Sequence, residues 1–302
     1  MLSVIICTYN REKYIYNVLR SIAENHYPKD GYEVVLVDNN CTDNTLAECG
    51  RFQDDFPDVR FTICHEAQQG LSHARNCGIR ESKGDILVYV DDDAEVNDRY
   101  LETYAAFFER NPEAMAAGGP IIPRYETAEP EWFSHYTRML VTGNLYLGDS
   151  EREFPKGAFP GGGNVAYRRS VFDKVGLFNV ELGRKGNSLI GAEEKDLFDK
   201  MTGLGMKFYY LPTAILYHII PERKLTDDYF KRLSYSIGQS ERYRTKSISG
   251  KKYRKRLLQE AVKWCGTLCL WLGFALKLQF KKGNKLVVFR KMVTKGLLAS
   301  SC

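Results

Sequence analysis

The first ninety residues alternate between short apolar, β-branched runs and longer stretches with helical spacing. The apolar runs predict strands at Ser3–Cys7, Glu33–Val37, Arg60–Cys64 and Asp85–Val90. The stretches between them predict helices at Glu12–Glu24, Thr45–Phe52 and Leu71–Ser82. Continuous apolar strands separated by helices are typical of a parallel sheet that helices cover on both faces. We therefore expect an α/β fold with a Rossmann-like, mainly parallel sheet.

Three of the predicted strands end in clusters of polar residues. The clusters are Thr8-Tyr9-Asn10-Arg11, Asp38-Asn39-Asn40 and Asp91-Asp92-Asp93. In an open α/β sheet, ligands bind in the crevice at the carboxyl ends of the strands. The three clusters are therefore expected to surround one ligand cleft.

The middle of the chain is less regular. Its pattern predicts a strand at Asn164–Arg168, a helix beginning at Ser170, a helix at Ala192–Leu204 and a strand at Phe208–Leu211. The α/β pattern ends near residues 221–223. We therefore predict one domain over residues 1–225 and a helical extension over residues 226–302.

The predicted extension is basic and partly apolar. Residues 223–302 contain 20 Lys and Arg against 4 Asp and Glu, whereas residues 1–222 contain 23 basic and 34 acidic residues. The segment Leu257–Phe280 is mostly apolar, and its longest uncharged run, Trp264–Leu276, has 13 residues. Because a membrane-spanning helix needs about 20 apolar residues, a helix lying in the interface of an anionic membrane is the preferred interpretation. A helix packed on the protein core is the alternative.

Other features limit the classes of protein. The chain has 44% hydrophobic and 27% charged residues, which is typical of a globular protein. The basic residues flank an apolar run and do not alternate with exposed aromatic residues, so no nucleic-acid partner is expected. The 8 cysteines show no CxxC or paired spacing, which indicates reduced thiols. Met1 leads directly into an apolar run without a basic region, so we expect no signal peptide and a cytoplasmic protein.

Asp91, Asp92 and Asp93 are the sharpest chemical signal. They follow a strand that is predicted to be buried, and alternate side chains of an extended segment point the same way, so Asp91 and Asp93 can share one face. Two carboxylates at one point favour a hard cation such as Mg²⁺ or Mn²⁺ between them. The alternative is an acidic turn in which Asp93 or Asn97 caps the next helix.

Asp38 leaves the second strand in the equivalent position. A single carboxylate there suits the ribose or base of a nucleotide, although the same residues also favour a simple turn. No GxGxxG follows the first strand and no GxxxxGK[ST] occurs in the chain. These absences argue against a dinucleotide-dependent dehydrogenase and against a P-loop enzyme.

Four segments that follow one another in the chain carry a family resemblance. They are Ser3-Val-Ile-Ile-Cys-Thr-Tyr-Asn-Arg11, Val35-Leu-Val-Asp-Asn-Asn-Cys-Thr-Asp-Asn-Thr45, Gly70-Leu-Ser-His-Ala-Arg-Asn-Cys-Gly78 and Val90-Asp-Asp-Asp93. Together they resemble the family-2 glycosyltransferases over about residues 1–225. The resemblance implies the GT-A fold.

The resemblance also implies roles for residues in the predicted cleft. It places Thr8, Tyr9 and Arg11 at the nucleotide base and ribose, Asp38 at the nucleoside, Arg75 and Asp92 near the nucleotide, and Asp91 and Asp93 at the metal. Asp93 is the expected direct metal ligand. Arg75 has an alternative role as a buried ion-pair partner of one of these acids.

A second group of implied residues lies further along the chain. Gly191-Ala-Glu-Glu-Lys-Asp-Leu197 resembles an acidic motif, usually Glu-Asp, whose second acid is the catalytic base. By that alignment Glu194 is the base and Glu193 its neighbour, although acids in a first helical turn are also favoured by the helix dipole. Gly162 and Asn164 are expected to border the donor sugar, or else to form a loop without ligand contacts. His218 is expected near the diphosphate or metal, or else as a packed residue.

These expectations combine into one function. We expect an inverting glycosyltransferase that uses Mn²⁺ or Mg²⁺ and a nucleotide-diphosphate sugar, with UDP as the expected nucleotide. The expected acceptor is a glycan or a lipid-linked saccharide at the inner face of the membrane. A nucleotidyltransferase and a non-catalytic sugar-nucleotide-binding protein are the alternatives. The former should carry a basic, Gly-rich loop near its N-terminus, and the latter would tolerate loss of the acids.

Overall fold

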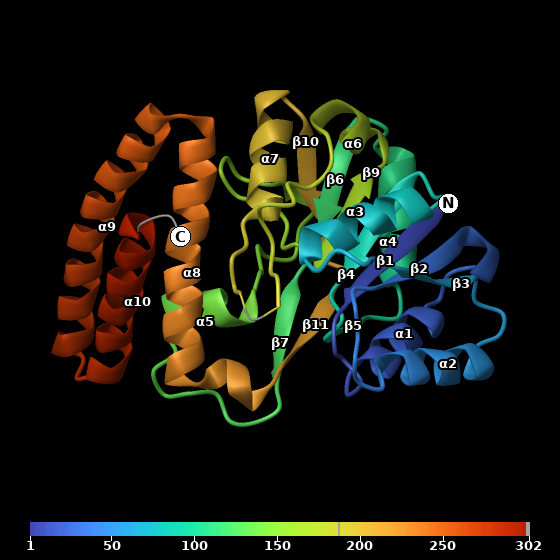
Figure 1. Ribbon diagram of the computed structural model, residues 1–302, viewed down its shortest axis with the longest axis horizontal. Helices are drawn as coiled ribbons and strands as arrows, with labels where there is room; N and C mark the ends of the chain where they lie inside the picture. Colours follow the sequence, from blue (N-terminus) through green and yellow to red (C-terminus); the bar gives the residue numbers. More distant parts are fainter. Residues whose placement is uncertain (187, 300–302) are drawn as a thin grey trace. The chain divides into compact units, whose positions relative to one another are not determined.

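The structure is a computed structural model that describes residues 1–186 and 188–299; Cys302 lies outside them. The chain forms two compact units (Figure 1). The first, the α/β unit, contains residues 1–124, 144–181 and 193–219. The second, the helical unit, contains residues 125–143, 182–192 and 220–302. The helical unit thus includes two segments from the middle of the chain, and the boundary at residues 225/226 stays a prediction.

The α/β unit is built on an eight-stranded sheet with the order β3-β2-β1-β4-β9-β6-β10-β8. Strand β1 pairs in parallel with β2 and β4, and β2 with β3, whereas β9 is antiparallel to both β4 and β6. The strands are β1 (Leu2–Thr8), β2 (Tyr32–Asp38), β3 (Phe61–His65), β4 (Ile86–Val90), β6 (Ala114–Gly118), β8 (Arg152–Glu153), β9 (Asn164–Arg168) and β10 (Lys207–Tyr210). The predicted mainly parallel sheet is confirmed.

Helices cover both faces of this sheet, also as predicted (Figure 1). Side chains of α1 (Ile15–Ala23), α2 (Thr45–Asp55) and α4 (Tyr100–Arg110) form one core with one face of the strands. Side chains of α3 (Leu71–Glu81), α6 (Ser170–Val175) and α7 (Glu193–Gly203) form the other. Neighbouring residues of β1 alternate between these cores, because successive strand side chains point to opposite faces.

A small second sheet has the order β5-β11-β7. Its strands are β5 (Ala94–Val96), β7 (Ile121–Tyr125) and β11 (Leu216–Ile220). Strand β5 begins directly after Asp93, and His218 of β11 pairs with Ala94 in the antiparallel register. The chain therefore places His218 beside the predicted metal-binding acids. Short 3₁₀ turns at η1 (Lys29–Gly31) and η2 (Glu222–Leu225) complete the connections.

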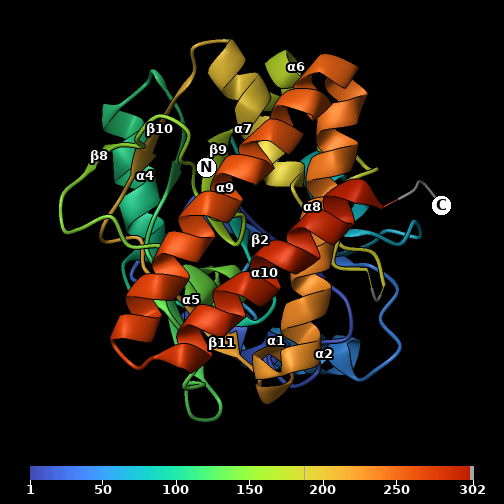
Figure 2. The same ribbon diagram turned by 90° about the vertical axis from the view of Figure 1, so that its left-hand side faces the viewer.

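The helical unit contains α5 (His135–Thr142), α8 (Asp227–Ile248), α9 (Gly250–Leu276) and α10 (Phe280–Leu298). Figure 2 shows α8, α9 and α10 side by side. Helices α8 and α10 approach closely at two glycines, since a Cβ atom on Gly238 would lie 2.2 Å from the carbonyl oxygen of Val293, and one on Gly296 would lie 2.1 Å from that of Tyr235. No helix of the described residues is long and apolar enough to cross a membrane.

The apolar segment Leu257–Phe280 is not one continuous element. Helix α9 ends at Leu276 and α10 begins at Phe280. Leu278 between them has a left-handed backbone conformation, with φ of 56°. Most of the predicted segment therefore belongs to α9, which packs against α8 and α10 inside the helical unit.

Candidate active site

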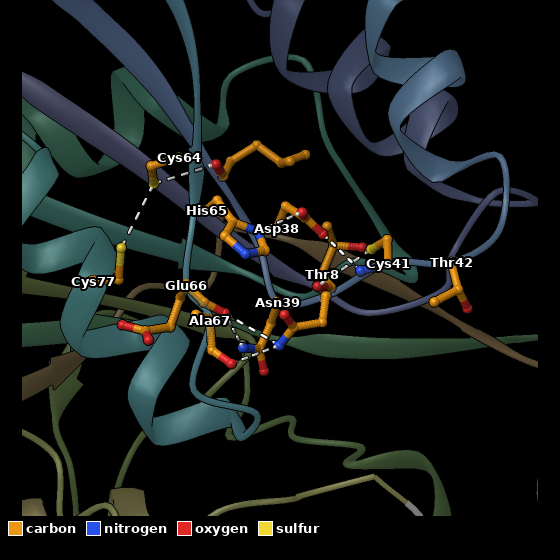
Figure 3. Close-up of polar contacts among 12 residues, drawn as sticks. Thr8, Asp38, Asn39, Cys41, Thr42, Cys64, His65, Glu66, Ala67 and Cys77 are labelled. Atoms are coloured by element: carbon orange, nitrogen blue, oxygen red, sulfur yellow. Dashed lines mark hydrogen bonds and ion pairs between the residues drawn. The ribbon is translucent and has the colours of Figure 1, made fainter.

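Asp38 and His65 form one end of the predicted cleft (Figure 3). Both are the last residues of neighbouring strands, β2 and β3. Asp38 Oδ1 accepts a hydrogen bond of 2.8 Å from the backbone N–H of Cys41, and Oδ2 lies 2.9 Å from His65 Nδ1. Burial opposes ionisation of Asp38, but these hydrogen bonds outweigh it and lower the pKa of the carboxyl. Asp38 is therefore held as an oriented carboxylate.

His65 was not predicted as a site residue. It directly follows the predicted strand Arg60–Cys64, so the rule that ligands bind at the carboxyl ends of parallel strands could have found it. Thr8, the last residue of β1, lies opposite Asp38 in the parallel register. Its side chain is buried, and its Oγ1 has no hydrogen-bond partner within residues 1–186 and 188–299. Such a group is suited to a ligand, because buried polar atoms are usually satisfied.

Arg11 connects the first strand end to the aspartate cluster. Its Nε lies 2.9 Å from Asp92 Oδ1, and its Nη2 lies 3.9 Å from Asp93 Oδ2. The backbone N–H of Tyr9 donates to Asp92 Oδ2 at 3.3 Å. Burial raises the pKa of Asp92, Arg11 opposes this rise, and the neighbouring Asp93 and Asp91 add to it. The cluster therefore carries negative charge that one guanidinium offsets only in part.

His218 and Asp93, two of the expected metal-site residues, lie close together. Nε2 of His218 lies 3.3 Å from Oδ1 of Asp93. The alternative role of the aspartate cluster as a helix cap is wrong, because Asp93 leads into β5 and the N-cap of α4 is Arg99, which makes no side-chain cap. Asn97 instead accepts a hydrogen bond from the backbone N–H of Ile215.

Arg75 and two glutamates form the other end of the site. Arg75 Nη1 lies 2.8 Å from Glu193 Oε1 and 2.8 Å from Glu194 Oε1, and all three side chains are largely buried. Burial opposes ionisation of Glu194, but Arg75 outweighs it and lowers the pKa of the carboxyl. Both acids lie in the first turn of α7, where the helix dipole also favours negative charge. Arg75 thus pairs with these glutamates and not with the aspartates named in the alternative.

Two glycines bring this group next to the aspartate cluster. A Cβ atom on Gly162 would lie 1.9 Å from the Glu194 carboxylate, and one on Gly163 would lie 2.1 Å from the Asp91 carboxylate. Any side chain larger than hydrogen at these positions would displace an acid. The carboxylates of Glu194 and Asp91 therefore contact two consecutive residues of the glycine loop.

Asn164, the next residue, has a different environment from its predicted one. It is fully buried, and its Nδ2 donates to the carbonyl oxygens of Pro120 and Ala214. Its Oδ1 accepts from the hydroxyls of Tyr100 and Tyr104. These bonds use the hydrogen-bonding capacity of the amide and fix its side chain at the glycine loop, and its place beside the donor sugar stays a prediction.

The donor set suits a divalent cation that also binds substrate. Asp93 and His218 supply carboxylate oxygen and imidazole nitrogen close together, and Asp91 lies in the same cluster. Among the described residues, no group of three or more His, Cys, Asp or Glu side chains converges as a complete metal site. Mg²⁺ in phosphate-transfer sites commonly takes one or two carboxylates and completes its shell with substrate phosphates and water. The residues fit that type of site.

Residues 3–176 match the family described as Glycosyl transferase family 2. The chain belongs to this family. The glycosyltransferase is 29% identical over 245 residues to the glucosyl-dolichyl phosphate glucuronosyltransferase of Haloferax volcanii. The matched region covers 80% of this chain and 76% of that protein. It is 37% identical over 178 residues to glycosyltransferase AglE of the same organism, across 58% of this chain and 55% of that relative. The chain thus spans only about half of the second relative.

Solved structures confirm the predicted GT-A fold of the glycosyltransferase. The mannosyltransferase PcManGT from Pyrobaculum calidifontis, described in complex with GDP-Man and Mn²⁺, matches with a TM-score of 0.64 at 19% identity, over 98% of this chain and 87% of that one. Residues 1–349 of S. aureus TarS, described in complex with UDP, match with a TM-score of 0.55 at 17% identity, over 97% and 90%.

Proposed function

We propose that this glycosyltransferase transfers one sugar from a nucleotide-diphosphate sugar, with UDP as the expected nucleotide, and inverts the anomeric carbon. The observation that carries this proposal is that two acids, Glu194 and Asp91, lie against the neighbouring glycines Gly162 and Gly163. Glu194 is a partly buried carboxylate with a lowered pKa, and it lies against Gly162, while Asp91 of the aspartate cluster lies against Gly163. A base for the acceptor and a site for the departing diphosphate are thus close together.

Glu194 is the proposed base. A sugar hydroxyl is a weak nucleophile, and a carboxylate within hydrogen-bond reach can accept its proton as the bond to the anomeric carbon forms. Arg75 holds this carboxylate ionised, and Glu193 shares the same guanidinium. With Glu194 as base, the acceptor hydroxyl attacks the donor directly in a single displacement, which inverts the anomeric centre by the geometry of inverting glycosidases.

The other residues bind the donor. Asp38, held by Cys41 and His65, is proposed to bind the nucleoside, and Thr8, Tyr9 and Arg11 to line its base and ribose. Asp91, Asp93 and His218 would hold Mn²⁺ or Mg²⁺. Such an ion, when bound, neutralises charge on the departing phosphate. Asp92 is proposed to hold Arg11 in place.

The acceptor is proposed to be a glycan or a lipid-linked saccharide. Support comes from the names of two relatives. The H. volcanii relative is named for a glucosyl-dolichyl phosphate, and the Methanococcus voltae relative for a dolichyl N-acetylglucosaminyl phosphate. An enzyme with a lipid-linked acceptor must work at a membrane, so we place the protein peripherally at the inner, cytoplasmic face.

A donor screen tests this function. Purified protein is incubated with UDP- and GDP-sugars, and nucleotide release is measured with Mn²⁺ and then with EDTA. We expect release from one class of donor, lost in EDTA, and a product of inverted configuration by NMR. Retained configuration would contradict the single displacement. Pyrophosphate release from a nucleoside triphosphate would identify a nucleotidyltransferase, and donor binding without turnover in any acceptor mixture would identify a non-catalytic binding protein.

A further inference from the structure

Helix α9 carries polar residues on its buried side and apolar residues on its exposed side. Of residues 250–276, all of them described, the buried ones are Arg256, Glu260 and Thr267. Soluble helices normally bury their apolar stripe and expose the polar one. In α9 the fully buried residues are polar, several leucines are exposed, and Trp264, Trp271 and Phe274 are half-buried.

A network of ion pairs fixes the buried side. Arg256 Nε lies 3.1 Å from Glu241 Oε2, and its Nη1 lies 2.8 Å from Glu260 Oε2. Arg290 Nη1 lies 2.9 Å from the other oxygen of Glu260. Because charges buried inside a protein need partners, α9 cannot rotate its leucines inward without leaving these groups unpaired.

The exposed side forms a broad apolar surface, here called the outer face. It consists of Leu258, Val262, Leu268, Leu272 and Leu276, together with the exposed thiols of Cys265 and Cys269. Leu272 is 56% exposed and Leu276 is 87% exposed. Contiguous apolar surfaces of this kind mark contact with a membrane or with another protein.

The charged residues of α9 and α10 are almost all basic. Residues 250–298 contain 13 Lys and Arg, and their single acid is the buried Glu260. Exposed Lys251, Lys252 and Lys255 precede the apolar surface, and exposed Lys277 follows it. The flanks are therefore complementary to an anionic surface.

We propose that the outer face of α9 binds an anionic lipid bilayer, with the helix lying in the plane of the membrane. Its leucines would enter the boundary between headgroups and acyl chains, about 5–10 Å deep, and the flanking lysines would contact lipid phosphates. This inference rests on the proposed peripheral location of the enzyme and is independent of its reaction.

A second copy of the chain is a less suitable occupant. Two outer faces in contact would bring the basic flanks of both copies together, and residues 250–298 offer no exposed acid to offset that repulsion. The exposed apolar residues also cover a wider arc than the two-position seam of a coiled coil. Lipid provides both the apolar phase and the negative charge.

Vesicle sedimentation of the full chain tests the proposal. We expect binding to vesicles of phosphatidylglycerol and phosphatidylcholine, weaker binding in high salt because the lysine contacts are screened, and little binding to pure phosphatidylcholine. Leu272→Gln/Leu276→Gln should weaken binding at least about tenfold, because it removes apolar area without changing charge. The matched control is Leu204→Gln, since Leu204 is 60% exposed at the end of α7, and it should bind like the parent.

Chemical protection of the thiols gives a second measurement. Cys265 and Cys269 are exposed on the outer face, and both fall in the tryptic peptide 264–277. Anionic vesicles should slow their reaction with a water-soluble maleimide at least about tenfold. Cys41 should react at the same rate with and without vesicles.

The outcomes separate the inference from the proposed function. Absence of the parent protein from anionic vesicles at low salt would overturn both the docking surface and the peripheral location. Binding that survives Leu272→Gln/Leu276→Gln with unprotected thiols would overturn only the surface. If the parent protein binds no vesicles, is a dimer by light scattering and becomes a monomer on this double substitution, the outer face is the contact between two copies. Nucleotide release should be the same in the parent and the double variant.

Discussion

The two units of the molecule each bury a cluster of charged side chains, and the clusters differ in how their acids and bases are paired. In the α/β unit, Glu193 and Glu194 share the guanidinium of Arg75, and Asp91 lies nearby. In the helical unit, Glu241 and Glu260 alternate with three arginines, and ion pairs close the network. A cluster in which several acids share one base is suited to accept a cation or a proton, whereas a closed network can do neither without losing an ion pair.

The surroundings of the two clusters differ as well. The carboxylates of Glu194 and Asp91 lie against the backbone of Gly162 and Gly163, where a Cβ atom would collide with them. The Glu260 carboxylate instead lies among side chains that donate hydrogen bonds to it, such as those of Arg290 and Thr294. Perturbed acids occur in functional sites and in structural networks alike. Charge balance and the contacts around the acids therefore distinguish a functional site from a structural network better than burial does.

The largest expected effect is that of Glu194→Gln. Removing the base should lower kcat by about 10²–10⁴-fold, while donor affinity changes little because the base acts on the acceptor. Stopped transfer assays and donor titration measure the two quantities. Glu193→Gln is the matched control and should be milder. If Glu193→Gln is the crippling change and Glu194→Gln is mild, the roles of the two acids are reversed.

Asp93→Ala should have the next largest effect. It removes one carboxylate of the proposed metal site, and we expect a loss of about 10²–10³-fold, as for other single groups that stabilise developing charge. The fold should remain, as circular dichroism would show. The control is Asp85→Ala, at the exposed opposite end of β4. Full Mn²⁺-dependent turnover by a folded Asp93→Ala protein would remove this residue from the metal site.

Gly163→Ala should lower activity by about 10–10²-fold, because its Cβ atom would displace the Asp91 carboxylate and small misplacements at a reacting centre are costly. Gly203→Ala is the control. Its Cβ atom would meet nothing within 4 Å, and alanine favours a helix. Turnover is measured at saturating donor. Equal activities for the two variants would mean that the close approach of Asp91 to Gly163 is unimportant.

Much of the fold could be predicted from the sequence where periodicity is strong. The predicted strands and helices up to Val90 agree with the structure within a few residues. Strand β6 was missed because its sequence, Ala-Met-Ala-Ala-Gly, has low β-propensity. Residues 226–302 were predicted only as a helical extension, without the bounds of its helices. The break before α10 could not be predicted, because residues 277–279 contain neither glycine nor proline.

The site was predictable by residue type but not by contact. The strand-end rule identified the aspartates and Asp38, since position along a strand is a local property. The pairing of Arg75 with Glu193, 118 residues away, depends on tertiary packing. The same holds for Asn164, whose four hydrogen-bonding positions are taken by the tyrosines and carbonyls of distant segments.

The smallest effect on activity is expected from Glu260→Gln, in the closed cluster. Turnover should stay within about twofold, because Glu260 is a buried residue of the helical unit outside the proposed site, and its substitution acts on stability. The free energy of unfolding should fall by about 3–5 kcal/mol, the usual cost of removing one partner of a buried ion pair. Urea unfolding and hydrogen exchange in α8–α10 measure it. Glu131→Gln is the control, because its pair with Lys281 is exposed and should contribute little to stability.

The contribution of Glu260 to the free energy of unfolding should depend on pH. Burial opposes ionisation of Glu260, but hydrogen bonds from Arg256 and Arg290 outweigh it and hold its pKa below the ordinary 4.5. A group with a lowered folded-state pKa stabilises the protein above its unfolded pKa, and that stability is lost as pH falls through the folded value. The parent should therefore lose stability in the helical unit below about pH 4.5. Glu260→Gln should show a smaller decrease over the same range, because its amide does not titrate. An equal decrease in both proteins would assign the acid sensitivity to other carboxylates.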